Sequence, residues 1–320
     1  MKTALVTGAT GFVGRQLCRQ LLSGGWRVLA LARKPDETLC DASLCFDLAE
    51  GRPLPDFGEA VDTVFHLAAK AHALAETPAE TGDYQRINVE GTRLLVDAAV
   101  RNGTRAFVYV SSVKVFGEAQ QRQDRGLIES DAPQPDTPYG SSKLAAEAIV
   151  FGAEAIPHRV VLRPALMYGS GVKGNLARMW TAVAGSLFPP LPETGARRSM
   201  LHRDDLCAAL ELAAGSAAAR GRVFHATDGR PLSARGILEA IRAAQGRKPL
   251  RRAVPVPVLQ WAAWAGDLGG RLSGRRFPLD SDSLRKLIGP AWFDSTRLER
   301  ELGWRPRQSF SNSARELSRR

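Results

Sequence analysis

A glycine-rich turn near the N-terminus constrains the fold of this chain more than any other feature. The turn is Thr7-Gly-Ala-Thr-Gly-Phe-Val-Gly14, with a glycine at every third position from 8 to 14. A β-type run over residues 3–6 precedes it, and an apolar-periodic stretch reaching Leu22 follows it. Glycines let the backbone approach a pyrophosphate closely, and the following helix turns its free N–H groups toward the negative charge. The pattern therefore predicts a strand, a phosphate-binding turn and a helix.

Strand and helix patterns continue to alternate after this turn. Strand-type runs cover residues 27–32, 62–67 and 106–110, and helical patterns cover residues 87–102 and 138–152. Repeated alternation of this kind favours an α/β fold with a doubly wound parallel sheet, whose ligand site lies at the carboxyl ends of the strands.

The length of the chain and the pattern of its cysteines limit the classes of protein to which it can belong. The chain has 320 residues, of which 44% are hydrophobic, so we expect a globular protein with a substantial core. Its four cysteines, at positions 18, 40, 45 and 207, form no CxxC pair and no zinc spacing. No stretch resembles a signal peptide. We therefore expect reduced thiols, no metal and a cytoplasmic location.

The formal net charge of +11 fits nucleic acid, an anionic membrane surface or a polyanionic small substrate. Much of the excess lies late in the chain, at Arg247-Lys248, Arg251-Arg252, Arg271, Arg275-Arg276, Arg285-Lys286 and Arg319-Arg320. No helix-turn-helix, zinc finger or aromatic-interleaved basic motif accompanies these residues, so nucleic acid is not an expected partner. A solvated surface is the favoured interpretation, and a contribution to phosphate binding is the alternative.

The apolar run over residues 254–272 contains Leu259, Trp261, Trp264 and Leu268. It is too short and too interrupted for a spanning helix, which needs about 20 apolar residues. Core packing is the favoured interpretation, and an interfacial helix is the alternative because basic residues flank the run. No membrane insertion is expected.

Tyr139 and Lys143 form a candidate proton-transfer pair. Four residues apart on a helix, they share one face. A tyrosine has a pKa of roughly 10, and an adjacent cation lowers that pKa by favouring the phenolate. A solvated helix carries such pairs too, but the glycine turn favours the catalytic interpretation.

The end of the second predicted strand bears on the coenzyme. Arg33-Lys34 stands where a dinucleotide-binding pattern often places an acid for the adenosine ribose. A guanidinium there suits a 2′-phosphate, which favours NADP(H) over NAD(H). The alternative is that Arg33 only begins a solvated loop.

Taken together, the motifs of this chain resemble the extended short-chain dehydrogenase/reductase family of NAD(P)-dependent nucleotide-sugar epimerases, dehydratases and ketoreductases. They occur in the family's order along nearly the whole chain. Besides the glycine turn, the matching segments are Asp47-Leu48, His66-Leu-Ala-Ala69, Asn88-Val-Glu-Gly-Thr92, Ser111-Ser-Val-Lys-Val-Phe-Gly117, Pro138-Tyr-Gly-Ser-Ser-Lys143, Leu162-Arg-Pro164, Arg198-Ser-Met-Leu-His-Arg-Asp-Asp-Leu206 and Leu302-Gly-Trp-Arg-Pro306.

The resemblance implies a catalytic triad of Ser112, Tyr139 and Lys143. Tyr139 would exchange a proton with a sugar hydroxyl or ketone oxygen, Ser112 would hydrogen-bond that oxygen, and Lys143 would lower the tyrosine pKa while holding the nicotinamide ribose. It also implies a set of residues for NAD(P)(H): Gly8, Gly11, Phe12, Val13, Gly14, Arg33, Asp47, Leu48, Leu67, Ala68, Ala69, Lys143 and Pro164.

For a UDP-sugar substrate, the resemblance implies contacts from Ser112, Lys114, Asn175 and Arg198. Arg198 has an alternative role as a surface ion-pair partner of Asp204 or Asp205. Two further residues have structural interpretations: Asn88 as the organiser of a backbone turn, and His66 as a hydrogen-bonded core histidine.

The resemblance also bears on the reaction. The family's 4,6-dehydratases place an Asp-Glu pair directly after the residue matching Ser112, whereas this chain has Val113-Lys114, which disfavours elimination. A 4-ketoreductase acting on a UDP-linked 2-acetamido-6-deoxy-4-keto-hexose is favoured, both by Arg33 and by motifs similar to those of bacterial surface-polysaccharide reductases. A UDP-glucose or UDP-N-acetylglucosamine 4-epimerase is the alternative. A non-catalytic sensor or scaffold and a reductase of a non-sugar ketone are further alternatives.

The resemblance finally implies two lobes and a dimer. Residues 1–164 with about 201–228 would bind the dinucleotide, and residues 165–200 with 229–320 would form a smaller, mixed substrate lobe. A homodimer would form through the helices that begin near Asn88 and Tyr139.

Overall fold

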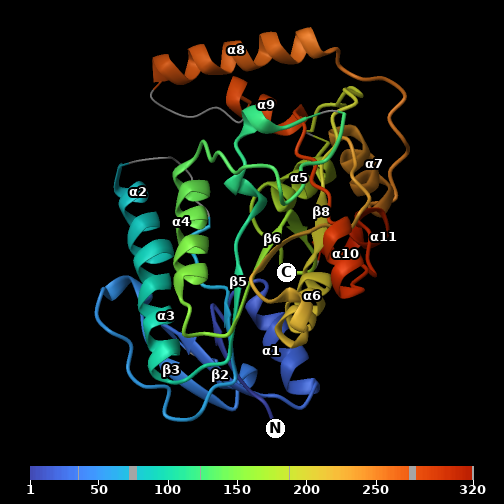
Figure 1. Cartoon of the computed structure of the whole chain (residues 1–320). Coiled ribbons are helices and arrows are strands. Elements are labelled where there is room, and N and C mark those ends of the chain that lie inside the picture. The colour runs from blue at the N-terminus through green and yellow to red at the C-terminus, as the bar shows by residue number, and fades with distance from the viewer. Residues whose placement is uncertain (35, 72–77, 123, 187, 274–278, 319–320) are drawn as a thin grey trace.

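A seven-stranded parallel sheet forms the scaffold of the chain (Figure 1). The structure, a computed structural model, describes every residue except 35, 72–77, 123, 187, 274–278 and 319–320, so the basic pairs at 275–276 and 319–320 lie outside the described residues. The strands are β1 (Thr3–Thr7), β2 (Arg27–Ala32), β3 (Ala42–Cys45), β4 (Thr63–His66), β5 (Ala106–Val110), β6 (His158–Pro164) and β9 (Arg222–Ala226).

The order of these strands is β3-β2-β1-β4-β5-β6-β9, and every pairing is parallel. The direction of winding reverses between β1 and β4, which is the topological switch point where α/β sheets bind ligands. The predicted doubly wound Rossmann sheet is confirmed.

Helices cover both faces of the sheet. They are α1 (Gly14–Ser23), α2 (Pro78–Tyr84), α3 (Gly91–Arg101), α4 (Pro138–Gly152), α5 (Asn175–Ala184), α6 (Arg203–Gly215), α7 (Ala234–Ala244), α8 (Val256–Ser273), α9 (Ser281–Ile288), α10 (Thr296–Leu302) and α11 (Phe310–Ser313). Figure 1 shows α3 and α4 on one side of the sheet and α1 and α6 on the other. A π-helical segment, Gln85–Glu90, leads into α3. Single 3₁₀ turns cover Glu37–Leu39, Leu48–Glu50, Val113–Val115, Glu118–Gln120, Ala217–Ala219 and Ala314–Ser318.

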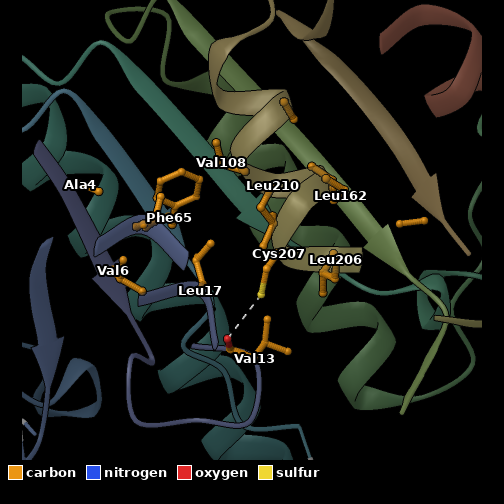
Figure 2. Close-up of a cluster of buried hydrophobic side chains, with 14 of the residues drawn as sticks. Ala4, Val6, Val13, Leu17, Phe65, Val108, Leu162, Leu206, Cys207 and Leu210 are labelled. Atoms are coloured by element: carbon orange, nitrogen blue, oxygen red, sulfur yellow. Dashed lines mark hydrogen bonds between the residues drawn. The ribbon is translucent and has the colours of Figure 1, made fainter. Parts of the chain in front are cut away.

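The core beneath α1 and α6 also fixes the glycine turn. Leu17 from α1 and Leu206 and Leu210 from α6 pack on apolar side chains of β1, β4, β5 and β6 (Figure 2). The buried Cys207 thiol donates a hydrogen bond, 3.8 Å long, to the carbonyl oxygen of Val13 at the start of α1. All four cysteines are free, as predicted.

The C-terminal part of the chain is mainly helical. A two-stranded parallel sheet of β7 (Leu166–Tyr168) and β8 (Met200–His202) accompanies it. Apolar side chains from α5, α7, α8, α9 and α11 form a cluster of their own around Tyr168 and Phe310. The residue boundaries of the two lobes stay a prediction.

The apolar run predicted to pack in the core does so on one side only. Leu259 and Ala263 of α8 are buried in the C-terminal cluster, whereas Trp261 is 69% exposed and Trp264 is 56% exposed. Among the described residues, no helix combines the length and apolar character needed to cross a bilayer.

We expect the substitution Leu210→Ala to lower the free energy of unfolding by about 2–5 kcal/mol, because it leaves a cavity between α6 and the sheet. Leu212→Ala on the same helix is the matched control, since its side chain is 37% exposed. Urea denaturation of both variants measures the difference. Equal losses at the two positions would contradict the packing described for α6.

Candidate active site at the carboxyl edge of the sheet

The Thr7 hydroxyl ties the ends of β1 and β4 together. Its Oγ1 accepts hydrogen bonds from the backbone N–H groups of Leu67, at 3.2 Å, and Ala68, at 3.1 Å. It lies 2.7 Å from Nδ1 of His66, so the hydroxyl donates its one proton to that nitrogen. These bonds bring the Leu67–Ala68 backbone up to the glycine turn.

His66 is a core histidine, as predicted. With Nδ1 accepting from Thr7, Nε2 carries the ring proton and donates to Oγ1 of Thr92 at 2.9 Å. The Thr92 hydroxyl then donates to the Asn88 carbonyl oxygen at 2.6 Å. Burial, assisted by the charge of Lys143, lowers the pKa of His66 to about 3. The imidazole is therefore neutral and serves as a structural link.

The glycine turn is packed too closely for side chains. Gly8 has a positive φ of 68°, and a Cβ there would lie 2.9 Å from the Ala68 nitrogen. A Cβ on Gly14 would lie 2.0 Å from the Gly8 carbonyl oxygen. α1 begins at Gly14, and its N-cap residue Val13 provides no side-chain cap. Among the described hydrogen bonds, the backbone N–H groups of Phe12 and Val13 have no acceptor, so they can serve an outside acceptor. The turn therefore fits a dinucleotide pyrophosphate.

The residues expected around the adenosine lie at the ends of neighbouring strands. Arg33 is exposed directly after β2. Asp47 caps the turn Leu48–Glu50 by accepting a hydrogen bond from the Ala49 N–H at 3.0 Å. Leu48 is buried next to Gly91, the first residue of α3. A Cβ added to Gly91 would lie only 3.1 Å from the Leu48 Cβ.

Asn88 organises the backbone that follows β4, so its structural interpretation is confirmed. Its Oδ1 accepts from the Lys70 N–H at 2.8 Å, and its Nδ2 donates to the Lys70 carbonyl at 3.1 Å. Nδ2 also donates to Oγ of Ser142 on α4, at 2.9 Å. The segment after β4, which includes Ala69, is therefore fixed against α4.

Ser112 and Tyr139 meet where β5 ends and α4 begins. Ser112 caps the turn Val113–Val115, and Thr137 caps α4 by accepting a hydrogen bond from the Gly140 N–H at 3.1 Å. Ser112 lies close enough to the Tyr139 phenol to act on its pKa, which it lowers. A Cβ on Gly140 would lie only 2.2 Å from the Lys114 carbonyl oxygen. Glycine at this position therefore lets α4 approach the Ser112 segment closely.

Lys143 is almost completely buried, with 2% of its surface exposed. Its Nζ donates to the Val110 carbonyl oxygen at 2.6 Å and lies 4.3 Å from the centre of the Tyr109 ring. Burial lowers the pKa of Lys143 to about 7, against the opposing effect of the Glu147 charge. Lys143 follows Tyr139 by one turn on α4, and its ammonium group lies at the end of β5.

The expected lowering of the Tyr139 pKa is wrong for this structure. Burial raises that pKa to about 12; the hydrogen bond with Ser112 lowers it and the nearby Tyr84 raises it. The physical reason is that Lys143 directs its ammonium group to the Val110 carbonyl, so desolvation of the phenol dominates. The phenol is accordingly protonated at neutral pH.

A buried ion pair that sequence reasoning missed holds α4 against the sheet. Arg163 on β6 donates from Nε and Nη2 to the two carboxylate oxygens of Glu147, at 2.9 and 2.6 Å. The Ser111 hydroxyl donates to the same carboxylate. Two signals in the sequence pointed to it: Arg163 interrupts an apolar strand, and Glu147 lies one helical turn after Lys143.

The predicted substrate residues lie in two places. Desolvation lowers the pKa of Lys114, Glu118 and Asp136 oppose this, and the positive charges of Arg198 and Lys286 add to it. The side chain of Lys114 therefore shares a region with two other cations and two carboxylates. Arg198 donates from Nη1 to the Gly289 carbonyl at 2.6 Å. Asn175 is the exposed first residue of α5, and no described contact joins it to the cations.

The alternative role of Arg198 as an ion-pair partner is wrong. Asp205 instead accepts hydrogen bonds from the backbone N–H groups of Arg307 and Gln308, and Asp204 pairs with Arg203 at 3.2 Å. The guanidinium of Arg198 therefore keeps its charge for the region shared with Lys114.

We predict that Gly140→Ala destabilises the protein by about 1–3 kcal/mol, because the new methyl group collides with the Lys114 carbonyl. Gly152→Ala at the other end of α4 is the control, since a Cβ there meets no atom within 4 Å. Thermal unfolding of the two variants distinguishes them. A melting temperature for Gly140→Ala equal to that of the control would disprove the close approach.

Relatives with a similar sequence cover nearly the whole chain. UDP-glucose 4-epimerase of Vibrio cholerae is 28% identical over 99% of this chain and 94% of its own length. The 2-alkyl-3-oxoalkanoate reductase of Stenotrophomonas maltophilia is 27% identical over 98% of this chain and 97% of its own length. The solved structure of MoeE5 in complex with UDP-glucose and NAD is 26% identical, with a TM-score of 0.72, and the match covers 99% of this chain and 97% of MoeE5.

A family description, the NAD dependent epimerase/dehydratase family, matches residues 4–226. This segment runs from β1 to β9 and therefore includes the complete seven-stranded sheet, the glycine turn and the helix that carries Tyr139. The chain belongs to the NAD-dependent epimerase/dehydratase family.

Proposed function

We propose that this protein is an NAD(P)-dependent 4-ketoreductase of a UDP-linked 2-acetamido-6-deoxy-4-keto-hexose. The observation that carries the proposal is that Ser112, after β5, lies close to Tyr139 at the start of α4, with the buried Lys143 one helical turn after Tyr139. MoeE5, which shares the fold and 26% of the aligned sequence, is described in complex with UDP-glucose and NAD, which supports this substrate class and coenzyme.

The coenzyme supplies the hydride when it is bound. The protein's part is to place the ketone and to move a proton. Because its pKa is raised to about 12, the Tyr139 phenol is protonated at neutral pH and suits the role of general acid toward the ketone oxygen. The Ser112 hydroxyl donates a second hydrogen bond to that oxygen. In this proposal the Lys143 ammonium group turns from the Val110 carbonyl toward the phenolate left after proton transfer and stabilises it.

The cations beside this pair suit a nucleotide diphosphate. Lys114 and Arg198 act on each other electrostatically, and the charge of Glu118 acts on both. Among the described hydrogen bonds and ion pairs, neither side chain binds a carboxylate directly. An arginine and a lysine in one region provide the hydrogen-bond donors and positive charge that a diphosphate requires. In this proposal Asn175 contacts the same group from the start of α5.

Elimination of water is disfavoured by the residues that follow Ser112. Val113 is buried in an apolar cluster, and the side chain of Lys114 lies near two other cations. A 4,6-dehydratase reaction needs carboxylates in that position as acid and base, and this chain has none there.

A UDP-hexose 4-epimerase is the second candidate, favoured by the 28% identity to the Vibrio cholerae enzyme of that name. The same three residues serve this reaction, with Tyr139 accepting a proton in the first half and returning it in the second. A reductase of a non-sugar ketone is a further alternative, in line with the name of the Stenotrophomonas maltophilia relative. A non-catalytic sensor is disfavoured because Ser112, Tyr139 and Lys143 are all present.

We propose NADP(H) as the preferred coenzyme. Arg33 is exposed at the end of β2 with Lys34 beside it, and the nearby carboxylate of Asp36 is engaged by Arg15 at 2.9 Å. Arg33 is therefore available to a 2′-phosphate. A homodimer through α3 and α4 and a cytoplasmic location remain part of the proposal.

The direct test mixes purified protein, the UDP-linked ketosugar and either NADPH or NADH. We expect the coenzyme to be oxidised in proportion to the ketosugar, faster with NADPH than with NADH. Absence of oxidation with both coenzymes would refute the reductase. Tightly bound NAD together with interconversion of UDP-N-acetylglucosamine and UDP-N-acetylgalactosamine, without added coenzyme, would establish the epimerase instead.

Tyr139→Phe removes only the phenolic oxygen. We expect turnover to fall by about 10²–10⁴-fold, because the ketone loses its general acid. Coenzyme affinity, measured by fluorescence titration, should change little, since the glycine turn and Lys143 are unaltered. Tyr168→Phe is the control, because that buried tyrosine lies in the C-terminal cluster. Wild-type turnover by Tyr139→Phe would remove Tyr139 from the reaction.

A further inference from the structure

One side of α8 is apolar and exposed. Leu259 and Ala263 pack on the C-terminal cluster, so the opposite side of this 18-residue helix faces outward. We call this side the outer face; it consists of Val258, Trp261, Ala262, Trp264, Ala265 and Leu268. All six residues are exposed, with exposed fractions from 44% to 69% for the four large ones. Monomeric proteins seldom present a continuous apolar stripe of this kind without a partner.

The two tryptophans form the centre of the outer face. Their rings are 5.8 Å apart in an edge-to-face arrangement. An indole ring joins a large apolar surface to a polar N–H group, and it therefore suits the boundary between lipid and water. The single carboxylate of α8, Asp267, is turned to α9, where it accepts hydrogen bonds from the Ser281 N–H and hydroxyl at 3.1 and 2.6 Å. No carboxylate lies on the described outer face.

Arginines lie beyond both ends of the outer face. Arg251 and Arg252 are exposed just before α8, and Arg271 is exposed in its last turn. The whole chain carries a net charge of +11. An apolar, tryptophan-bearing stripe bordered by arginines is complementary to a bilayer whose headgroups are anionic.

We propose that α8 lies in the plane of an anionic membrane surface, with its outer face buried among the lipid headgroups and its arginines on the phosphates. A second copy of the chain fits the outer face less well than an anionic membrane does. In a symmetric pair of α8 helices, in either relative direction, the terminal arginines of one copy would face those of the other and repel them. The anionic lipid surface instead neutralises them.

The position of α8 gives this contact a consequence for the active site. Figure 1 shows α8 at the end of the molecule opposite the N-terminus, with α9 beneath it. Asp267 joins α8 to the first residue of α9, and Arg285 on α9 pairs at 3.1 Å with Glu118, four residues after Lys114. Membrane docking therefore presents the substrate side of the protein to the bilayer. The docking itself does not depend on the proposed reaction.

The test is flotation of the full-length protein with vesicles of phosphatidylcholine alone or with about a third phosphatidylglycerol. We expect binding to the anionic vesicles to exceed binding to the neutral ones by at least about tenfold, and to weaken as salt is raised. The double variant Trp261→Ser/Trp264→Ser should lose at least about tenfold in binding to anionic vesicles.

Two further variants complete the design. Arg251→Gln/Arg252→Gln should also weaken anionic binding, whereas Leu212→Ser, which alters an exposed apolar side chain on α6, should not. Thermal unfolding checks that each variant keeps the wild-type fold. Failure of the wild-type protein to bind anionic vesicles would overturn the proposal. So would undiminished binding by the tryptophan variant, or a wild-type dimer that only the tryptophan substitutions dissociate.

Discussion

The burial of the Lys143 charge is the constraint on which the site depends. Removing an ammonium group from water costs several kcal/mol unless nearby groups compensate. Here the Val110 carbonyl, the Tyr109 ring and the charge of Glu147 offset part of this cost, and the remainder lowers the pKa of Lys143 to about 7. Glu147 is in turn neutralised by Arg163. Positive Lys143 and negative Glu147 on α4 and positive Arg163 on β6 therefore form a series of alternating charges. They fix the helix, and with it the Tyr139 phenol, relative to the end of β5.

Much of this architecture could be predicted from local sequence. The glycine turn predicts a strand, a turn and a helix because its glycines stand between a strand-type run and an apolar-periodic run. The structure shows why positions 8 and 14 are glycine: a Cβ there would collide with Ala68 or Gly8. The helix over Pro138–Gly152 begins and ends as predicted, since Thr137 and Pro138 provide a cap and a first turn. His66 and Asn88 have the structural roles predicted for them.

Other features depend on contacts between distant segments, which sequence patterns do not contain. Whether Lys143 bonds to Tyr139 or to the Val110 carbonyl is decided by the packing of α4 on β5, and so is the direction of the tyrosine pKa. For the helix around Trp261, the sequence favours core packing and leaves an interfacial helix as the alternative. Which side packs inward is set by the positions of α7 and α9, so only the folded chain reveals the exposed tryptophans.

We propose that this site directs a hydride to the carbon whose oxygen is protonated by Tyr139. The most direct measurement supplies the wild-type protein with the UDP-linked ketosugar and NADPH carrying deuterium at both hydrogens of its nicotinamide C4. The account predicts one deuterium at C4 of the sugar product, seen by NMR, for each coenzyme oxidised. A sugar product with hydrogen from solvent at that carbon, or coenzyme oxidation without a reduced sugar, would contradict it.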